Sequence, residues 1–244
     1  KNWNKYFSAN WLNKNYNFAI LETLLPDKKQ KKYNKRFVGL GDPDLSNNYQ
    51  FNDLPNTKNE LVSLAQASGG TIRDLYLRKD ANINNFREML KSNAERVVIA
   101  THAFPAYTSE FTNESGIVLS SNNSKNNFIT ASEIAQLNIN SEFIVLSVCD
   151  TGLSDIRYSK NHSSLSKAFL AAGVESVLIS NWSIESSSSA KITKEIFNNV
   201  WFDKNISKHE ALNIASENLR LDLSKEYNVH PAFWGAFSIV YSSL

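Results

Sequence analysis

Two residues suited to nucleophilic chemistry each follow a run of apolar residues. His102 follows "VVIAT", and Cys149, the only cysteine in 244 residues, follows "FIVLSV". Both runs are typical of buried strands. If these strands are parallel neighbours, the imidazole and the thiol emerge at the same edge of a sheet. An imidazole and the N-terminus of a nearby helix can then lower the pKa of the thiol and make it a nucleophile.

The residues alone leave a structural role open for both side chains. A cysteine after an apolar strand is often an inert small hydrophobe, and a lone histidine there is often a satisfied structural residue. Motifs for other chemistries are missing, because the sequence has no metal-ligand spacing, no dinucleotide or phosphate loop and no Gly-x-Ser-x-Gly elbow. We therefore expect no metal and no cofactor.

Apolar runs alternate with segments of helical periodicity from about Phe37 onward. Runs such as "VVIA", "FIVLSV" and "SVLIS" show no polar alternation, as in strands that are covered on both faces. The sequence therefore predicts an α/β fold with a mostly parallel sheet. We expect residues 1–35 to form an N-terminal helical appendage or linker, and residues 36–244 to form the functional domain.

Several helix positions are predicted locally. Thr57 with Glu60, and Thr130 with Glu133, have the spacing of a capping box and precede apolar residues at helical spacing. In the N-terminal stretch, residues 16–25 carry apolar side chains along one side of a helix. We predict a helix at each of these three places.

Charge and hydropathy narrow the range of partners. Lys and Arg number 26 and Asp and Glu 24, so the net charge of +2 does not favour a nucleic acid or an anionic lipid surface. No apolar run reaches the ~20 residues that cross a bilayer, and the first residues lack a signal peptide's pattern. One cysteine cannot form an internal disulfide, which fits a reducing compartment. We expect a cytoplasmic protein that contacts neither nucleic acid nor membrane.

Six blocks of the sequence, spread from about Phe37 to the C-terminus, resemble the CHAT domain family in their order and spacing. They are "FVGLGDPDL", "DLPNTKNELVSLA", "VVIATHAF", "ITASEIAQLNINSEFIVLSVCDTG", "SLSKAFLAAGVESVLISNWSI" and "HPAFWGAFSIVYS". CHAT proteins are caspase-like cysteine peptidases, related to separases and often carried behind tetratricopeptide repeats (TPR). The resemblance implies a caspase-like fold, with a mostly parallel central sheet and helices on both faces. It also implies a catalytic dyad of His102 and Cys149.

The resemblance implies roles for the residues around the dyad. Cys149 attacks the scissile carbonyl as a thiolate, and His102 protonates the leaving amine. The backbone N–H groups of Cys149 and Ala103 face the oxyanion. The family commonly has glycine after the histidine, so Ala103 departs from its pattern. Asp150 matches the acidic residue that follows the family's cysteine, although it can also serve the amides of its own turn.

The substrate pocket is implied to follow the strand "VLIS". Separase-like relatives, which cut after arginine, have an acidic residue just past a Leu-Trp-Asp block, and the matching stretch here is "SNWSIESS". Ser183 stands where that block has Asp, which leaves Glu185 as the charged residue. We therefore expect a neutral or mixed preference rather than a strictly basic one. Trp182 is either a wall of the pocket or a packing residue.

These residues and the resemblance together predict a hydrolase, a cysteine endopeptidase that cleaves a protein partner. We expect it to be the effector module of a larger, sensor-activated bacterial system of the TPR-CHAT type, with the sensor upstream of these residues. The alternative is a catalytically silent CHAT-like module that binds proteins. The intact pair of His102 and Cys149 favours the enzyme, whereas Ala103 favours the alternative.

Overall fold

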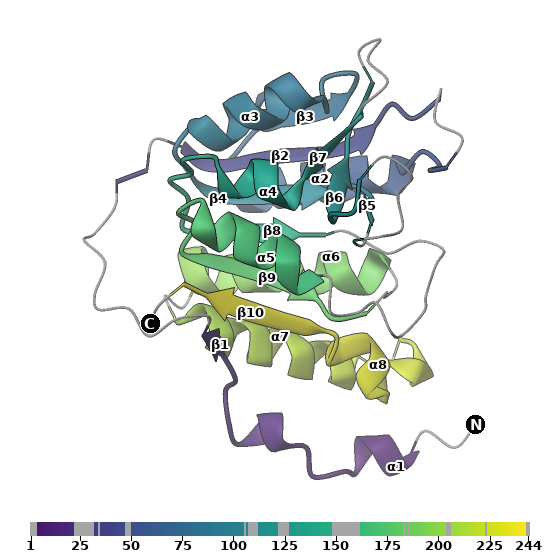
Figure 1. The fold of residues 1–244 in the computed structure, drawn as a ribbon. Coiled ribbons are helices and arrows are strands. Elements are labelled where there is room, and N and C mark those ends of the chain that lie inside the picture. The colour runs from purple at the N-terminus through teal and green to yellow at the C-terminus, as the bar shows by residue number, and fades with distance from the viewer. Residues whose placement is uncertain are drawn as a thin grey trace.

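A seven-stranded sheet forms the centre of the molecule (Figure 1). The computed structural model describes residues 4–21, 32–33, 35–46, 50–104, 106, 112–121, 127–147, 162–182, 184, 186–203, 206–222 and 224–242. In spatial order the strands are β1 (Ile20–Leu21), β10 (Phe237–Tyr241), β9 (Ser176–Ser180), β8 (Phe143–Leu146), β4 (Ala94–Ala100), β2 (Lys35–Pro43) and β3 (Leu75–Arg78). β10 runs antiparallel to β9, whereas the other neighbours run parallel. The predicted α/β fold with a mostly parallel sheet is confirmed.

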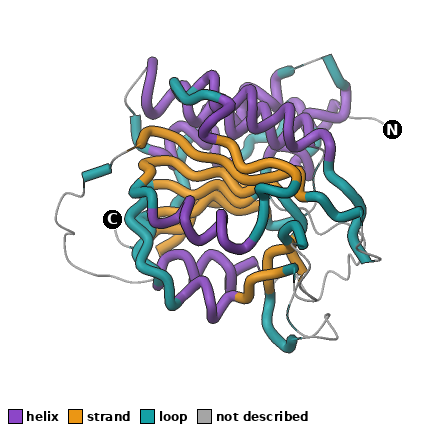
Figure 2. Tube along the Cα trace, turned by 90° about the horizontal axis from the view of Figure 1, so that it is seen from above, coloured by secondary structure: helices purple, strands orange, loops and turns teal. Residues whose placement is uncertain are grey.

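Helices cover both faces of this sheet, as Figure 2 shows from above. One face carries α3 (Ile83–Lys91), α4 (Ala131–Ala135) and α5 (His162–Ala171). The other carries α2 (Pro55–Ala67), α6 (Ser186–Phe197) with its π-helical extension Asn198–Asp203, and α7 (Lys208–Leu221). Shorter helices are α1 (Asn4–Phe7), α8 (Pro231–Trp234) and the 3-10 turns Leu12–Lys14, Ile72–Asp74 and Glu226–Val229. The sheet is thus the middle of three layers.

The central strands contribute side chains to two separate hydrophobic clusters. On β4, Val97 and Ile99 belong to the cluster under α3 and α5, whereas Val98 and Ala100 belong to the cluster under α2, α6 and α7. Successive side chains of a strand point to opposite faces, so a strand buried on both faces has no solvent-facing side that favours polar residues. This explains the unbroken apolar runs of the sequence.

A second, three-stranded sheet lies beyond the end of β4. It contains β5 (Ala103–Phe104), β6 (Gly116–Val118) and β7 (Phe128–Thr130), all antiparallel. Thr130 then begins α4 with the predicted capping box, because its hydroxyl accepts from the Glu133 amide while the Glu133 carboxylate accepts from the Thr130 amide. The small sheet therefore follows the candidate histidine directly.

Two local predictions are wrong. The helix predicted for residues 16–25 is absent over 16–21, where residues 16–19 have no regular secondary structure and Ile20–Leu21 form β1 beside β10. The capping box of Thr57 and Glu60 is also absent, since α2 begins two residues earlier, at Pro55, and has no side-chain cap. Thr57 instead accepts a hydrogen bond from the amide of Asp42, at the end of β2. The residues after Leu21 up to 31 lie outside the described ranges.

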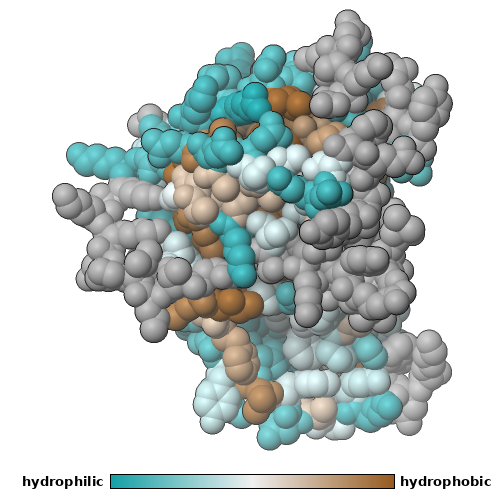
Figure 3. Space-filling view, in the orientation of Figure 1, coloured by the Kyte–Doolittle hydropathy of each residue, from teal (hydrophilic) through white to brown (hydrophobic). Residues whose placement is uncertain are grey.

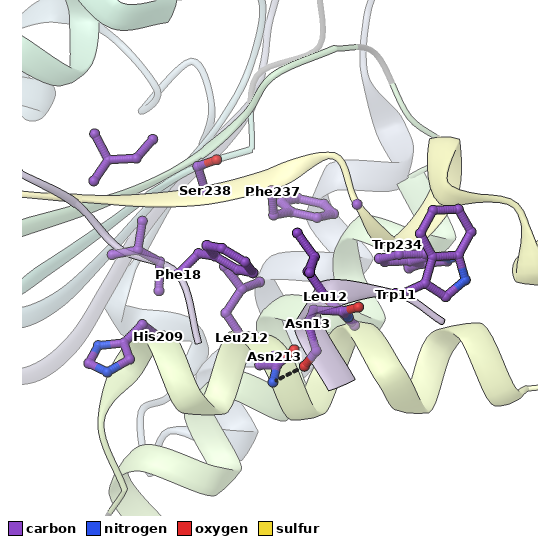
Figure 4. Close-up of a pocket in the computed structure, with 14 residues that line it drawn as sticks. Trp11, Leu12, Asn13, Phe18, His209, Leu212, Asn213, Trp234, Phe237 and Ser238 are labelled. Atoms are coloured by element: carbon purple, nitrogen blue, oxygen red, sulfur yellow. Dashed lines mark hydrogen bonds between the residues drawn. The ribbon is translucent and has the colours of Figure 1, made fainter. Parts of the chain in front are cut away.

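The N-terminal segment packs along β10 and α7 at one edge of the sheet. The ring centroids of Trp11 and Trp234 lie 5.2 Å apart. Both rings line a pocket of about 380 Å³, together with Leu212 and Phe237 (Figure 4). Phe18 is 59% exposed, and Figure 3 shows hydrophobic surface in the lower part of this face, where Figure 1 places β1. This edge is separated from β4 by β9 and β8.

Candidate active site

His102 lies between β4 and the small sheet, in a backbone segment that is fixed by β6. Its carbonyl accepts from the amide of Val118 at 2.9 Å, and the hydroxyl of the preceding Thr101 donates to the Val118 carbonyl at 2.8 Å. The residue is only 3% exposed. These bonds set the direction in which the imidazole leaves the edge of the sheet.

The imidazole of His102 is held by the loop that precedes α2. Its Nε2 lies 2.8 Å from the carbonyl oxygen of Asn52. The centroids of the Phe51 and His102 rings lie 5.2 Å apart, and the ring planes are inclined by 37°. A carbonyl oxygen can only accept, so Nε2 carries the proton of the neutral ring. Nδ1 is then the nitrogen that can take up a second proton.

Burial lowers the pKa of His102 from its ordinary value, and the hydrogen bond to the Asn52 carbonyl opposes this shift. Burial acts in this direction because it penalises the charged imidazolium. The ring is therefore neutral near pH 7. A neutral imidazole with a defined tautomer is suited to act as a general base.

The strand that leads to Cys149 is the parallel neighbour of the strand that leads to His102, as expected. Ile99 of β4 lies opposite Leu146 of β8, and each candidate residue follows that pair by three positions. The pairing continues past β8, since the Ser147 amide donates to the Ile99 carbonyl at 2.9 Å. Cys149 itself lies outside the described residues.

Ser147 also contacts a buried carboxylate. Its hydroxyl donates to Glu60 of α2 at 3.1 Å, and Glu60 is only 8% exposed. Burial raises the pKa of Glu60 to about 7, although the Ser147 bond acts against this shift. A titrating carboxyl therefore lies beside the last described residue before Cys149.

Ala103, the candidate oxyanion residue, is a buried residue of β5 paired with Ile117. It is not among the described residues with positive φ. Its backbone therefore has no need of glycine's conformational freedom. The alanine that departs from the family pattern fits its local structure without strain.

Three of the four pocket candidates follow β9, on the other side of β8 from β4. Trp182 is 43% exposed, and its indole Nε1 donates to the Ala232 carbonyl at 2.9 Å. Ser183 and Glu185 lie outside the described residues, as does Asp150 near Cys149. Trp182 is thus tethered beside the carboxyl ends of the parallel strands and is not a core residue.

The described part of the chain contains no group of three or more His, Cys, Asp and Glu side chains arranged to hold a metal ion. Within the same residues, no helix has the length and apolar character needed to cross a bilayer.

Comparison with known proteins supplies the family. The model of the CHAT domain matches residues 4–242. The chain belongs to the CHAT domain family. No curated protein matches its sequence.

A solved structure is also similar to this CHAT domain. It is a crystal structure of the Arg-specific cysteine proteinase gingipain R, with 11% identity and a TM-score of 0.45. The match covers 84% of this chain and 46% of the gingipain chain, so the CHAT domain spans less than half of that structure.

Two contacts of the CHAT domain's candidate site were not predicted. Asn52 acts through its backbone carbonyl, which any residue type can supply, so the sequence contains no signal for it. Glu60 had a visible signal, because a carboxylate stands in a helix of apolar periodicity, but its spacing from Thr57 suggested a cap. Only the folded structure shows that Asn52 contacts His102 and that Glu60 contacts Ser147.

Proposed function

We propose that this CHAT domain is a cysteine endopeptidase in which Cys149 and His102 cleave a peptide bond of a protein partner. The observation that carries the proposal is the state of His102. Its ring is buried, and its Nε2 proton is bound to the Asn52 carbonyl at the end of the strand next to that leading to Cys149. A buried structural histidine would also need such a partner, but the position of this one beside the strand that leads to Cys149 favours a catalytic role.

The proposed reaction follows from that tautomer. His102 Nδ1 accepts the thiol proton, and the Cys149 thiolate forms a bond with the scissile carbonyl carbon. The resulting oxyanion accepts hydrogen bonds from the backbone N–H groups of Ala103 and Cys149. When the C–N bond breaks, His102 returns the proton to the leaving amine, and water then hydrolyses the thioester.

Substrate residues beside the scissile bond would contact the segment after β9. Trp182 is exposed there, and we propose it as one wall of the pocket, with Asp150, Ser183 and Glu185 as further lining residues. As the CHAT resemblance implies, we propose that the domain serves as the effector of a larger sensor-activated system with its sensor outside these residues.

A thiol-reactive peptide probe tests the proposal, because one cysteine means that any covalent adduct reports on Cys149. We expect the folded wild type to react much faster than the urea-unfolded chain, and His102→Gln to lose roughly a hundredfold in rate. Cys149→Ala should form no adduct. His209→Gln is the matched control, since His209 contacts Ser207 and Tyr241 instead. Equal rates for folded and unfolded wild type would favour the silent protein-binding module.

A further inference from the structure

The carbonyl that holds His102 belongs to the same peptide unit as the amide nitrogen of Asp53. A peptide unit is planar, so whatever fixes Asp53 also limits the rotation of the Asn52 carbonyl. The oxygen must stay within hydrogen-bond range of Nε2, where it now lies at 2.8 Å. The contacts of Asp53 therefore decide how firmly the ring of His102 is held.

Both carboxylate oxygens of Asp53 have partners. Oδ1 accepts from the amide of Leu45 at 2.9 Å, and Oδ2 accepts from Nη2 of Arg78 at 3.1 Å. The first partner lies just after β2 and the second is the last residue of β3. The loop before α2 is thus tied to the ends of two strands of the central sheet.

The guanidinium of Arg78 is itself fixed by two further carboxylates. Nη1 bonds Asp42 at 3.0 Å and Nη2 bonds Asp44 at 3.3 Å. The Asp42 side chain is only 4% exposed. A planar guanidinium with several donors can hold separate carboxylates in one fixed geometry, which a lysine ammonium cannot do.

The backbone of Arg78 is held as well. It has a positive φ of 52°, which is unfavourable for a non-glycine residue and persists only where the surroundings impose it. Its carbonyl accepts from the Ser120 hydroxyl at 2.5 Å and from the Ala81 amide at 3.0 Å. The side chain therefore starts from an anchored position and is aimed at the acidic residues.

We propose that the ion pair of Arg78 and Asp53 is a positioning device for His102, acting through the Asn52 carbonyl to keep the proton on Nε2. The inference rests on the proposed function for its catalytic consequence, but the effect on the ring is independent of activity. The Arg78 and Asp53 side chains are 44% and 38% exposed, so their pair contributes little to the free energy of unfolding. Its loss should change the histidine more than the stability.

The test compares two carboxylates that contact the same nitrogen of Arg78. Asp53→Asn removes the charge from the loop that holds His102, whereas Asp44→Asn removes the charge from a residue outside that loop. Arg78→Lys retains the positive charge for the buried Asp42 but loses the fork. Urea unfolding of each variant confirms that it is folded.

The first readout is the ¹⁵N spectrum of histidine-labelled protein near pH 7.5, with the His102 signals assigned by their absence in His102→Gln. We expect a single Nε2–H tautomer for wild type and Asp44→Asn, and mixed tautomers for Asp53→Asn and Arg78→Lys. A single Nε2–H tautomer in Asp53→Asn would overturn the proposal.

The second readout is the rate of the thiol-reactive probe. Asp53→Asn and Arg78→Lys should each lose about tenfold, because a small misplacement of a reacting group is costly. The double variant should be no slower than the slower single variant, since both break one ion pair. If wild type itself does not react, the proposed function fails while the tautomers still test the positioning. If Asp44→Asn loses as much as Asp53→Asn, the assignment to the Asp53 loop is wrong.

Discussion

Carboxylates lie beside both strands of the candidate dyad, but in opposite electrostatic situations. Near the end of β4, Asp42 and Asp53 bond the guanidinium of Arg78. Beside the end of β8, Glu60 accepts a hydrogen bond from the uncharged Ser147 and is buried. Paired charges offset the cost of removing a carboxylate from water, whereas a hydroxyl offsets much less of it. The guanidinium of Arg78 therefore compensates the charges of the first cluster, whereas burial raises the pKa of Glu60 to about 7.

Helix α2 connects these two regions. Thr57 in its first turn accepts from the Asp42 amide at 2.9 Å, and Glu60, three residues later, contacts Ser147 at 3.1 Å. Residues three apart lie on the same side of a helix. One side of α2 thus contacts the ends of both β2 and β8. The two carboxylate regions are linked by one helix, but each has its own contacts, so a substitution can change one region at a time.

The largest expected effect comes from Glu60→Gln. The folded-state pKa of Glu60 is raised to about 7, so the folded protein holds this proton after the unfolded chain has released it. Wild-type stability should therefore fall, relative to the variant, as pH rises from the ordinary glutamate pKa to about 7. The relative loss between about pH 4 and pH 8 should be about 3 kcal/mol.

Urea unfolding at both pH values measures this loss. Glu88→Gln is the matched control, because the Glu88 side chain is 67% exposed in its pair with Lys91. Its stability should follow that of wild type at each pH. A Glu60→Gln variant that also runs parallel to wild type would mean that Glu60 does not titrate as a buried carboxyl.

The second effect is the loss of the ion pair between Arg78 and the buried carboxylate of Asp42 in Asp42→Asn. Asparagine tolerates the positive φ of 45° at this position, so the change removes the charge without adding backbone strain. We expect a loss of about 2 kcal/mol in the free energy of unfolding, because Arg78 loses its most buried partner. Asp80→Asn, at an exposed residue of the neighbouring turn, should cost almost nothing. Equal losses for the two variants would contradict the importance of the pair between Arg78 and Asp42.

The sequence predicted the strands that are buried on both faces, but not the short strand at the edge of the sheet. β4 and β8 are buried on both faces, so their apolar runs predicted both strands and the edge where His102 emerges. β1 is a two-residue strand at the sheet edge, too short for any alternation. The spacing of Phe18 and Leu21 therefore mimicked a helix, and only pairing with β10 corrects it.

The candidate site was predictable where side chains carry the chemistry. His102 is recognisable from its type and its place after a strand, but its partner is a backbone oxygen of Asn52. Glu60 looked like a cap because its spacing from Thr57 is shared by caps and by tertiary contacts on one side of a helix. Which reading applies depends on where α2 begins, and Pro55 places that start two residues before Thr57.

The smallest effect is expected for Ser147→Ala, which removes the hydroxyl bonded to Glu60. The loss should be about 1 kcal/mol. It should be larger at pH 8 than at pH 5, because the hydroxyl lowers the pKa of Glu60 by favouring the ionised carboxyl. Without it, this pKa rises above its present value, and the fall of stability with pH extends to higher pH.

Ser92→Ala is the matched control for this change. The Ser92 hydroxyl donates to the neutral carbonyl of Met89 at 2.6 Å, so its loss should be the same at both pH values. A pH-independent loss in Ser147→Ala as well would show that Ser147 does not sense the charge of Glu60. A loss that grows with pH would instead show that the Ser147 hydroxyl, two residues before Cys149, responds to the ionisation of Glu60. Such a dependence would distinguish Glu60 from the carboxylates that are paired with Arg78.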